Sequence, residues 1–217
     1  MSLVLRTAKI SLIIQIIAGI FLVMSLFYKL KPEDQILKKI AILELVVQVI
    51  EALFYVLIIR MISKGNLDTS FRYRDWFFST PTMLISTLLY LKYLDKKPVE
   101  VKETFKENKC NISIILGFNA LMLIFGYMGE KGILPKYPVF LLGTLFLTIS
   151  FGGLYEHAKK TKIGTIFLGI MFTIWAMYGV AFLLPLNPKN VSYNILDLFS
   201  KNFYGIFIFF VIALKKN

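Results

Sequence analysis

Seven long apolar stretches constrain the fold of this chain more than any other feature of its sequence. A helix that crosses the hydrocarbon core of a bilayer needs about 20 mostly apolar residues. A mean hydropathy of +0.70, with 57% hydrophobic and 18% charged residues, agrees with a membrane protein and argues against a soluble domain. The stretches that approach the required length cover residues 7–28, 38–63, 74–94, 111–128, 134–156, 163–186 and 192–214.

Continuous apolar runs predict helices rather than strands. Only helices and closed barrels satisfy their backbone groups inside lipid, and the strands of a barrel alternate between apolar and polar residues. We therefore expect an all-α membrane protein, a single domain over residues 1–217 that forms a seven-helix bundle. Arg6 and Lys9 precede the first stretch as in a signal peptide, but its apolar run is too long and lacks a small-residue cleavage site. We expect it to be retained as the first helix.

The distribution of basic residues predicts the topology. Lysines and arginines accumulate in cytoplasmic loops, so the richer side is expected to be cytoplasmic and to include the C-terminus, with the N-terminus outside. This topology explains the net charge of +12 without a nucleic-acid partner. The richer side carries Lys29, Lys31, Lys38, Lys39, Lys92, Lys96, Lys97, Lys102, Lys106, Lys109, Lys159, Lys160, Lys162, Lys215 and Lys216. The other side carries Arg6, Lys9, Arg60, Lys64, Arg72, Arg74, Lys131, Lys136 and Lys189.

Charged residues at membrane depth mark the candidate functional site. The sequence has no phosphate loop, metal-ligand cluster or nucleophile triad, so we expect neither an enzyme nor a metal site. Lys201 lies about ten residues, roughly 15 Å, from the outer end of its stretch, which is mid-membrane. Asp197 is one turn outward on the same face, and Asp75 reaches nearly the same depth in 74–94. We expect Asp75 to face Lys201, with Asp197 as a second carboxylate and Arg72 balancing the excess negative charge.

Two carboxylates around one deep lysine in a seven-helix bundle resemble the microbial rhodopsins. The segments "RYRDWFFSTP" and "LDLFSK" are similar to the motifs of the third and seventh helices of that family. The resemblance implies all-trans retinal bound to Lys201 as a protonated Schiff base, Asp75 as its proton acceptor and Asp197 as a counterion. It also makes Arg72 the gating arginine. The residues that it implies around the chromophore are Trp76, Thr80, Pro81, Asn119, Met122, Gly126, Trp175, Tyr178 and Phe182.

The chain departs from this family at several positions. Gly179 stands where a proline is usual, and Phe182 where a tryptophan is usual. Outward proton pumps of the family usually place a carboxylate eleven residues after the acceptor, and Ser86 occupies that position here. Serine does not donate a proton near neutral pH. The segment "PLNPKNVSYN" also lacks the glutamate pair that pumps use for proton release, so we expect a poor pump.

A polar stripe in the second stretch predicts an ion pathway. Glu44, Gln48, Glu51 and Tyr55 repeat at i, i+4, i+7 and i+11, on one face of a helix that is otherwise apolar. Acidic and amide side chains attract and partly hydrate cations. Interhelical hydrogen bonding is the alternative explanation. The predicted pathway comprises Ser11, Gln15, Glu44, Gln48, Glu51, Arg72 and Asn194.

This stripe also resembles the channelrhodopsins. The short loops and small size are similar to the viral rhodopsins of giant algal viruses, specifically their channel-forming first group. That resemblance implies a light-gated channel for monovalent cations and protons, opened by proton transfer to Asp75, in a host-cell membrane if the chain is viral. A slow light-driven outward proton pump and a photosensor that acts through a partner protein are the alternatives.

Overall fold

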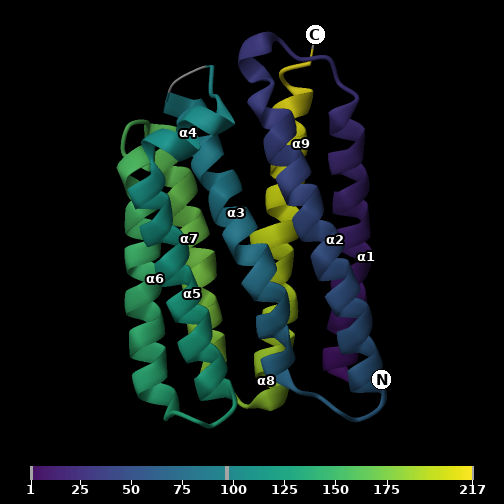
Figure 1. Ribbon diagram of the computed structural model, residues 1–217. Helices are drawn as coiled ribbons and strands as arrows, with labels where there is room; N and C mark the ends of the chain where they lie inside the picture. Colours follow the sequence, from purple (N-terminus) through teal and green to yellow (C-terminus); the bar gives the residue numbers. More distant parts are fainter. Residues whose placement is uncertain (1, 96–97, 217) are drawn as a thin grey trace.

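A bundle of long helices makes up the computed structural model, which describes residues 2–95 and 98–216 (Figure 1). Lys96 and Lys97, two of the predicted cytoplasmic lysines, lie outside the described residues. The long helices are α1 (Leu3–Leu26), α2 (Ile36–Ser63), α3 (Arg72–Asp95), α5 (Lys109–Glu130), α6 (Lys136–Ala158) and α7 (Lys162–Phe182). The last crossing consists of α8 (Leu186–Asp197), the π-helical segment η3 (Leu198–Asn202) and α9 (Phe203–Ala213). The connections contain η1 (Pro32–Asp34), η2 (Thr69–Phe71) and α4 (Val101–Glu107).

These helices cross the bundle seven times, which confirms the predicted fold class. Within the described residues, six helical spans are long and apolar enough to cross a membrane. The seventh crossing, α3, has 24 residues and is therefore about 36 Å long. It is less apolar than those six, because hydroxyl residues and Pro81 interrupt its apolar run and its two ends are charged. Arg72, Arg74 and Asp75 lie in its first turn, and Lys92 and Asp95 lie at its end.

The predicted ends of the last two crossings were wrong. α7 ends at Phe182 rather than at residue 186, and α8 begins at Leu186 rather than at residue 192. Pro185 precedes α8 in an extended conformation, with ψ of 159°. Proline is favourable just before or at the start of a helix and cannot continue the preceding one. The apolar side chains on both sides of this turn hid the boundary from the hydropathy pattern.

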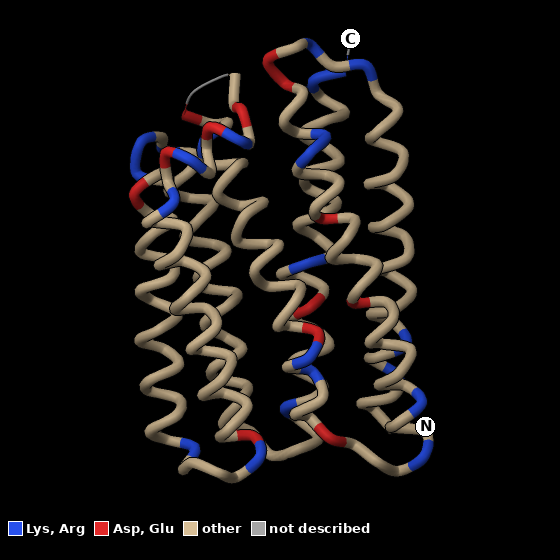
Figure 2. The backbone as a smooth tube through the Cα atoms, in the orientation of Figure 1, with Lys and Arg blue, Asp and Glu red and all other residues tan. Residues whose placement is uncertain are grey.

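The bundle reverses the usual distribution of polar residues. On α1 the bundle-facing side carries Ser11 and Gln15, which are both buried, whereas Ile10, Ile13 and Ile17 are exposed on the outer side. Charged residues gather at the two ends of the bundle, and a few lie between them (Figure 2). Neighbouring crossings pack in the order α1, α2, α3, α5, α6, α7 and α8–α9, and the last crossing returns to α1. The ring therefore closes around a partly polar interior.

Two adjacent glycines of α6 differ in their surroundings. A Cβ atom on Gly153 would lie 2.6 Å from Cγ1 of Ile115 on α5, whereas a Cβ on Gly152 would meet nothing within 4 Å. The close approach is stabilised by Asn111, whose Nδ2 donates to the Gly153 carbonyl at 2.9 Å. Gly153 therefore allows α5 and α6 to pack closely.

We expect Gly153→Val to lower the thermal unfolding temperature in detergent, because overpacking a tight contact costs about 1–3 kcal/mol. Gly152→Val is the matched control, since both variants place the same β-branched residue in the same helix. Equal unfolding temperatures for the two variants would contradict a packing role for Gly153.

Candidate functional site

Lys201 occupies the π-helical segment between α8 and α9, and its side chain is buried. A π-helical turn interrupts the regular hydrogen bonds of an α-helix, and such turns are frequent at functional sites. The Lys201 carbonyl accepts a hydrogen bond from Nε2 of Gln48 at 3.2 Å. The second helix therefore fixes the backbone of the lysine, and Gln48, which we had predicted as a pathway residue, also supports this segment.

Three carboxylates surround the Lys201 ammonium group. The Nζ atom lies 2.8 Å from Oδ2 of Asp75, 3.3 Å from Oε1 of Glu51 and 3.7 Å from Oδ1 of Asp197. The sequence predicted the first and third of these neighbours and placed Glu51 in the ion pathway instead. The signal that could have found this contact was depth, because Glu51 and Lys201 were both expected near mid-membrane.

Asp197 receives more donors than the other two acids. The hydroxyl of Tyr55 donates to its Oδ2 at 2.7 Å, and the hydroxyl of Tyr178 donates to its Oδ1 at 2.6 Å. Nη1 of Arg72 donates to Oδ2 at 3.3 Å. A carboxylate with several donors is stabilised in its charged form. Asp197 is thus the carboxylate of the site with the most hydrogen-bond donors, and two of these donors, Tyr55 and Tyr178, contact it in a way that their sequence positions did not indicate.

Arg72 is held on the side of the site nearer the N-terminal end of the bundle. Its Nε donates to Oδ1 of Asn190 at 3.2 Å, and its Nη2 contacts Oδ1 of Asn194. The guanidinium carbon also lies 5.6 Å from the ring centre of Tyr55 and 5.7 Å from that of Tyr193. These polar and cation–π contacts fix the guanidinium group between the carboxylate cluster and the chain segment before α3.

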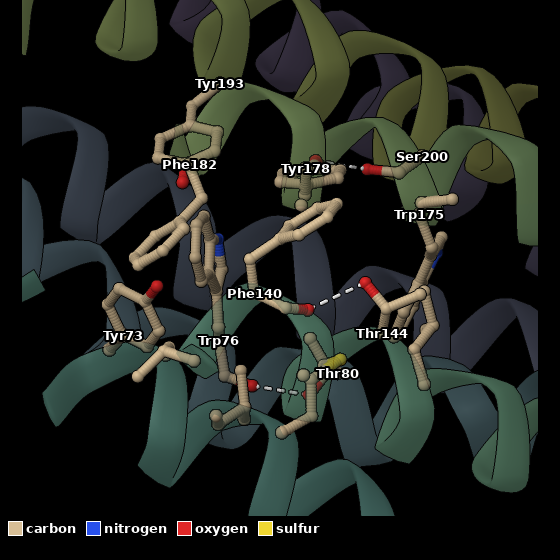
Figure 3. Close-up of a pocket in the computed structure, with 18 of the residues that line it drawn as sticks. Tyr73, Trp76, Thr80, Phe140, Thr144, Trp175, Tyr178, Phe182, Tyr193 and Ser200 are labelled. Atoms are coloured by element: carbon tan, nitrogen blue, oxygen red, sulfur yellow. Dashed lines mark hydrogen bonds between the residues drawn. The ribbon is translucent and has the colours of Figure 1, made fainter. Parts of the chain in front are cut away.

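A cavity of about 110 Å³ reaches Lys201 from the α5–α6–α7 side of the bundle. Aromatic side chains surround it, including Trp76, Trp175, Tyr178 and Phe182 (Figure 3). Apart from Lys201, its lining is apolar or carries only hydroxyl and indole groups. The predicted chromophore residues that line it are Trp76, Thr80, Met122, Gly126, Trp175, Tyr178, Phe182 and Lys201.

Two predicted chromophore residues lie outside this lining. Pro81 is a partly buried residue within α3, and Asn119 lies behind Thr80, to whose Oγ1 its Nδ2 donates at 2.9 Å. α6 contributes a further wall that the sequence did not predict, which consists of Val139, Phe140, Gly143, Thr144 and Leu147. These side chains have no polar or charged signature that would distinguish them from ordinary helix packing.

The cavity suits an apolar group attached to the lysine, because its lining is mostly apolar and includes Lys201. Gly126 lets the Tyr73 ring lie close to the α5 backbone at one wall, since a Cβ there would lie 2.8 Å from that ring. The reacting amine lies at the junction between this apolar cavity and the carboxylate cluster. Lys201 would hold retinal covalently, and Trp76, Trp175 and Phe182 would pack against its polyene and ring.

Five predicted pathway residues are buried and carry polar atoms without a hydrogen-bond partner within the described chain. Asn194 differs, because its amide nitrogen donates to Oγ1 of Thr7 at 2.8 Å while its oxygen contacts Arg72. The five residues are Ser11, Gln15, Glu44, Gln48 and Glu51.

The surroundings of Ser86 correct one step of the sequence argument. Its hydroxyl donates to Oε1 of Glu44 and lies 3.3 Å from the hydroxyl of Tyr204. A carboxyl group therefore does occupy this part of the bundle, supplied by α2 rather than by α3. The sequence pattern could not show this, because the two residues are 42 positions apart.

Comparison with known proteins identifies the family. A family model described as "Bacteriorhodopsin-like protein" matches residues 6–214. The chain belongs to this family. Over 175 residues the rhodopsin is 28% identical to the green-light absorbing proteorhodopsin of Gamma-proteobacterium EBAC31A08. The match covers 72% of this chain and 66% of that relative, so it spans just under two thirds of the relative's length.

Solved structures agree with the assignment. The crystal structure of viral rhodopsin OLPVRII superposes with a TM-score of 0.87 at 28% identity, covering 98% of this chain and 99% of that one. A blue light-absorbing proteorhodopsin from Med12 gives a TM-score of 0.79 at 18% identity, covering 98% of each chain, which shows likeness of fold. The cofactor of the rhodopsin is retinal, all-trans in the ground state.

We expect Lys201→Ala to abolish covalent attachment of all-trans retinal, because the substitution removes the amine that lies at the end of the cavity. The measurement is borohydride reduction of the reconstituted protein, followed by mass determination of the retinal adduct. Lys92→Ala, which removes a lysine near the end of α3, should still form the adduct. A reducible adduct in Lys201→Ala would show that another amine is the attachment site.

We expect Asp75→Asn to shift the visible band to longer wavelength. Removing the nearest anion lets the positive charge spread further along the polyene, which lowers the excitation energy. Absorption spectra across a pH series provide the test, with Asp68→Asn as a control outside the cluster. An Asp75→Asn spectrum that matches the wild type at every pH would make Asp197 the dominant counterion.

Proposed function

We propose that this rhodopsin is a light-gated channel for monovalent cations and protons, with its N-terminus outside the cell and its C-terminus in the cytoplasm. The observation that carries the proposal is the set of buried polar atoms along α1 and α2 that have no hydrogen-bond partner among the described residues. The orientation is supported by the larger number of lysines near the C-terminal end of the bundle.

The partnerless atoms favour water over interhelical hydrogen bonding. Leaving a buried polar group unsatisfied costs about 1–3 kcal/mol, whereas a bridging water removes most of that cost. The stripe of α2 does contact neighbouring helices, since Gln48 donates to the Lys201 carbonyl and Tyr55 donates to Asp197. On the facing side of α1, by contrast, the hydroxyl of Ser11 and both amide atoms of Gln15 find no partner among the described residues, so hydrogen bonds between helices do not account for them. A hydrated file between α1, α2 and the last crossing explains this arrangement.

The charged cluster forms the barrier at the middle of this file. Bound retinal supplies light absorption and a change of shape at the Lys201 nitrogen. Asp75, at 2.8 Å, is the carboxylate best placed to take the proton from that nitrogen. The transfer removes the cation on Lys201 and the anion on Asp75 together. Arg72 and Asp197 then remain as a pair, and the electrostatic attraction that holds the cluster closed is weakened.

A second constriction lies beyond the cluster, toward the C-terminal end of the bundle. Glu44, Ser86 and Tyr204 form a closed polar contact there, contributed by α2, α3 and α9. Ions must separate these three side chains in order to pass. Glu44 is the only acid among them, so it would attract a cation to this constriction when the contact opens.

A light-driven outward proton pump is the second candidate, and the same contact favours it. Glu44 places a carboxyl group beside Ser86, where the sequence had suggested that a proton donor was missing. The relatives among proteorhodopsins do not decide between the candidates. Photocurrent measured against voltage does, because a channel current reverses near the equilibrium potential of its ions, whereas a pump current stays outward over a wide range.

We expect Glu44→Gln to retain the visible band and to reduce the light-gated cation conductance several-fold. The substitution keeps the shape of the side chain but removes the carboxyl group that can ionise and attract a cation when the contact opens. The reduction should become smaller as ionic strength rises, because salt screens the charge over a shorter distance. Whole-cell photocurrents at several salt concentrations provide the measurement.

Glu103→Gln serves as the control for this experiment, since Glu103 is an exposed carboxylate of α4. It should leave the conductance unchanged. A wild-type photocurrent that never reverses, combined with a Glu44→Gln variant whose photocycle is slowed at its last steps, would support the pump and contradict the channel.

A further inference from the structure

We propose that Glu51 is a third carboxyl group of the counterion cluster and that it carries a proton in the dark. The inference rests on the attachment of retinal to Lys201. It is independent of whether the protein conducts or pumps, because it concerns the resting charge of the site.

The charges of the cluster do not balance without this proton. Two cations, Arg72 and Lys201, face the three carboxyl groups of Asp75, Asp197 and Glu51, and all five side chains are buried. If all three acids were ionised, one negative charge would remain uncompensated. A buried charge without a partner is strongly unfavourable, so the group takes up a proton instead.

The geometry selects the acid that holds the proton. Asp197 accepts hydrogen bonds from Arg72, Tyr55 and Tyr178. Asp75 accepts the short hydrogen bond from Lys201. By contrast, neither oxygen of Glu51 accepts a well-aligned hydrogen bond from residues 2–95 and 98–216, and the cation nearest to it is Lys201 at 3.3 Å. Glu51 is therefore the least stabilised of the three as an anion.

Attachment of the cofactor strengthens this selection. A free lysine ammonium has three N–H donors, which can serve several carboxylates at once. The nitrogen that carries retinal keeps a single N–H, and Asp75 at 2.8 Å is its nearest acceptor. Glu51 then has no N–H donor left on the Lys201 nitrogen. A neutral carboxyl group tolerates that loss, whereas a carboxylate does not.

Among the described residues, Lys201 is the cation that acts on Glu51. The buried residues of α1 include no titratable side chain. The charged and titratable groups that act on Glu51 are Lys201 on η3, Asp197 on α8, Asp75 on α3, Tyr55 on α2 and Tyr178 on α7. Arg72, the second cation of the cluster, is paired with Asp197.

A neutral Glu51 also keeps the cluster balanced after the proton transfer. In the dark, Arg72 and Lys201 balance Asp75 and Asp197. After one proton moves from the Lys201 nitrogen to Asp75, Arg72 alone balances Asp197. An ionised Glu51 would leave one excess negative charge in both states.

The test compares the absorption spectra of retinal-reconstituted variants in detergent. At neutral pH, Glu51→Gln should leave the visible band nearly unchanged, because glutamine resembles a protonated glutamate. Asp75→Asn should shift the band to longer wavelength under the same conditions. A long-wavelength shift in Glu51→Gln as large as that of Asp75→Asn would overturn the proposal, since it would mean that Glu51 is ionised in the dark.

Titration to alkaline pH provides the second measurement. Removing the proton from Glu51 adds a negative charge beside the Lys201 nitrogen, so the wild-type band should move to shorter wavelength. Glu51→Gln should lack this transition, and Glu51→Asp, which keeps a carboxyl group, should retain it. Glu44→Gln is the matched control, because it removes the other buried acid of α2, which contacts Ser86 rather than the cluster. An alkaline transition that persists in Glu51→Gln would overturn the proposal.

Infrared spectroscopy gives a readout that does not depend on band position. The protein in the dark should show a carboxylic acid C=O stretch that is lost in Glu51→Gln and kept in Glu44→Gln. If Glu51→Gln forms no pigment, the same stretch in wild type and in Glu51→Asp decides the question, and its absence from both would contradict the proposal. None of these measurements uses an ion current, so they can succeed or fail independently of the channel.

Discussion

The buried ammonium group of Lys201 is the constraint on which the rest of this structure depends. A cation at this depth is tolerated only with carboxylates close to it, and no single helix supplies enough of them. Asp75 comes from the first turn of α3, Glu51 from the middle of α2 and Asp197 from the end of α8. The relative rotation of these helices is therefore set by electrostatics at the centre of the bundle as well as by packing around it.

Lipid contact and hydration act on opposite faces of the same helices. On α1, isoleucines cover the outer face while Ser11 and Gln15 lie inside. On α2 the inner face carries Glu44, Gln48 and Glu51. Apolar side chains cannot drive such helices together inside lipid, so close packing and polar contacts do so. In a dry interface, the buried polar groups of this face would lower the stability of the bundle. Water that hydrates these groups offsets that cost, and the same water would form the proposed path for ions.

Depth could be predicted from the sequence, but rotation could not. Counting residues along each apolar stretch placed Asp75 and Asp197 at nearly the same depth and Lys201 one turn deeper, and the structure brings both acids close to Lys201. Glu51 was assigned nearly the same depth as Lys201, yet its contact with Lys201 depends on how α2 is turned toward η3. The pairing of Glu44 with Ser86 was missed for the same reason. The α6 wall of the cavity has only apolar, glycine and threonine side chains, which are equally common in helix packing.

The two glutamates of α2 contact two different sites, which lie too far apart for a single acid to contact both. Seven residues separate Glu44 from Glu51, which is about 10 Å along one helix face. Glu51 lies against the Lys201 nitrogen, and Glu44 lies against Ser86 and Tyr204. Between them, Gln48 donates to the carbonyl of Lys201 itself. A displacement of the lysine backbone would therefore reach both acids through one rigid helix, so the cluster and the second constriction can respond together to a change at Lys201.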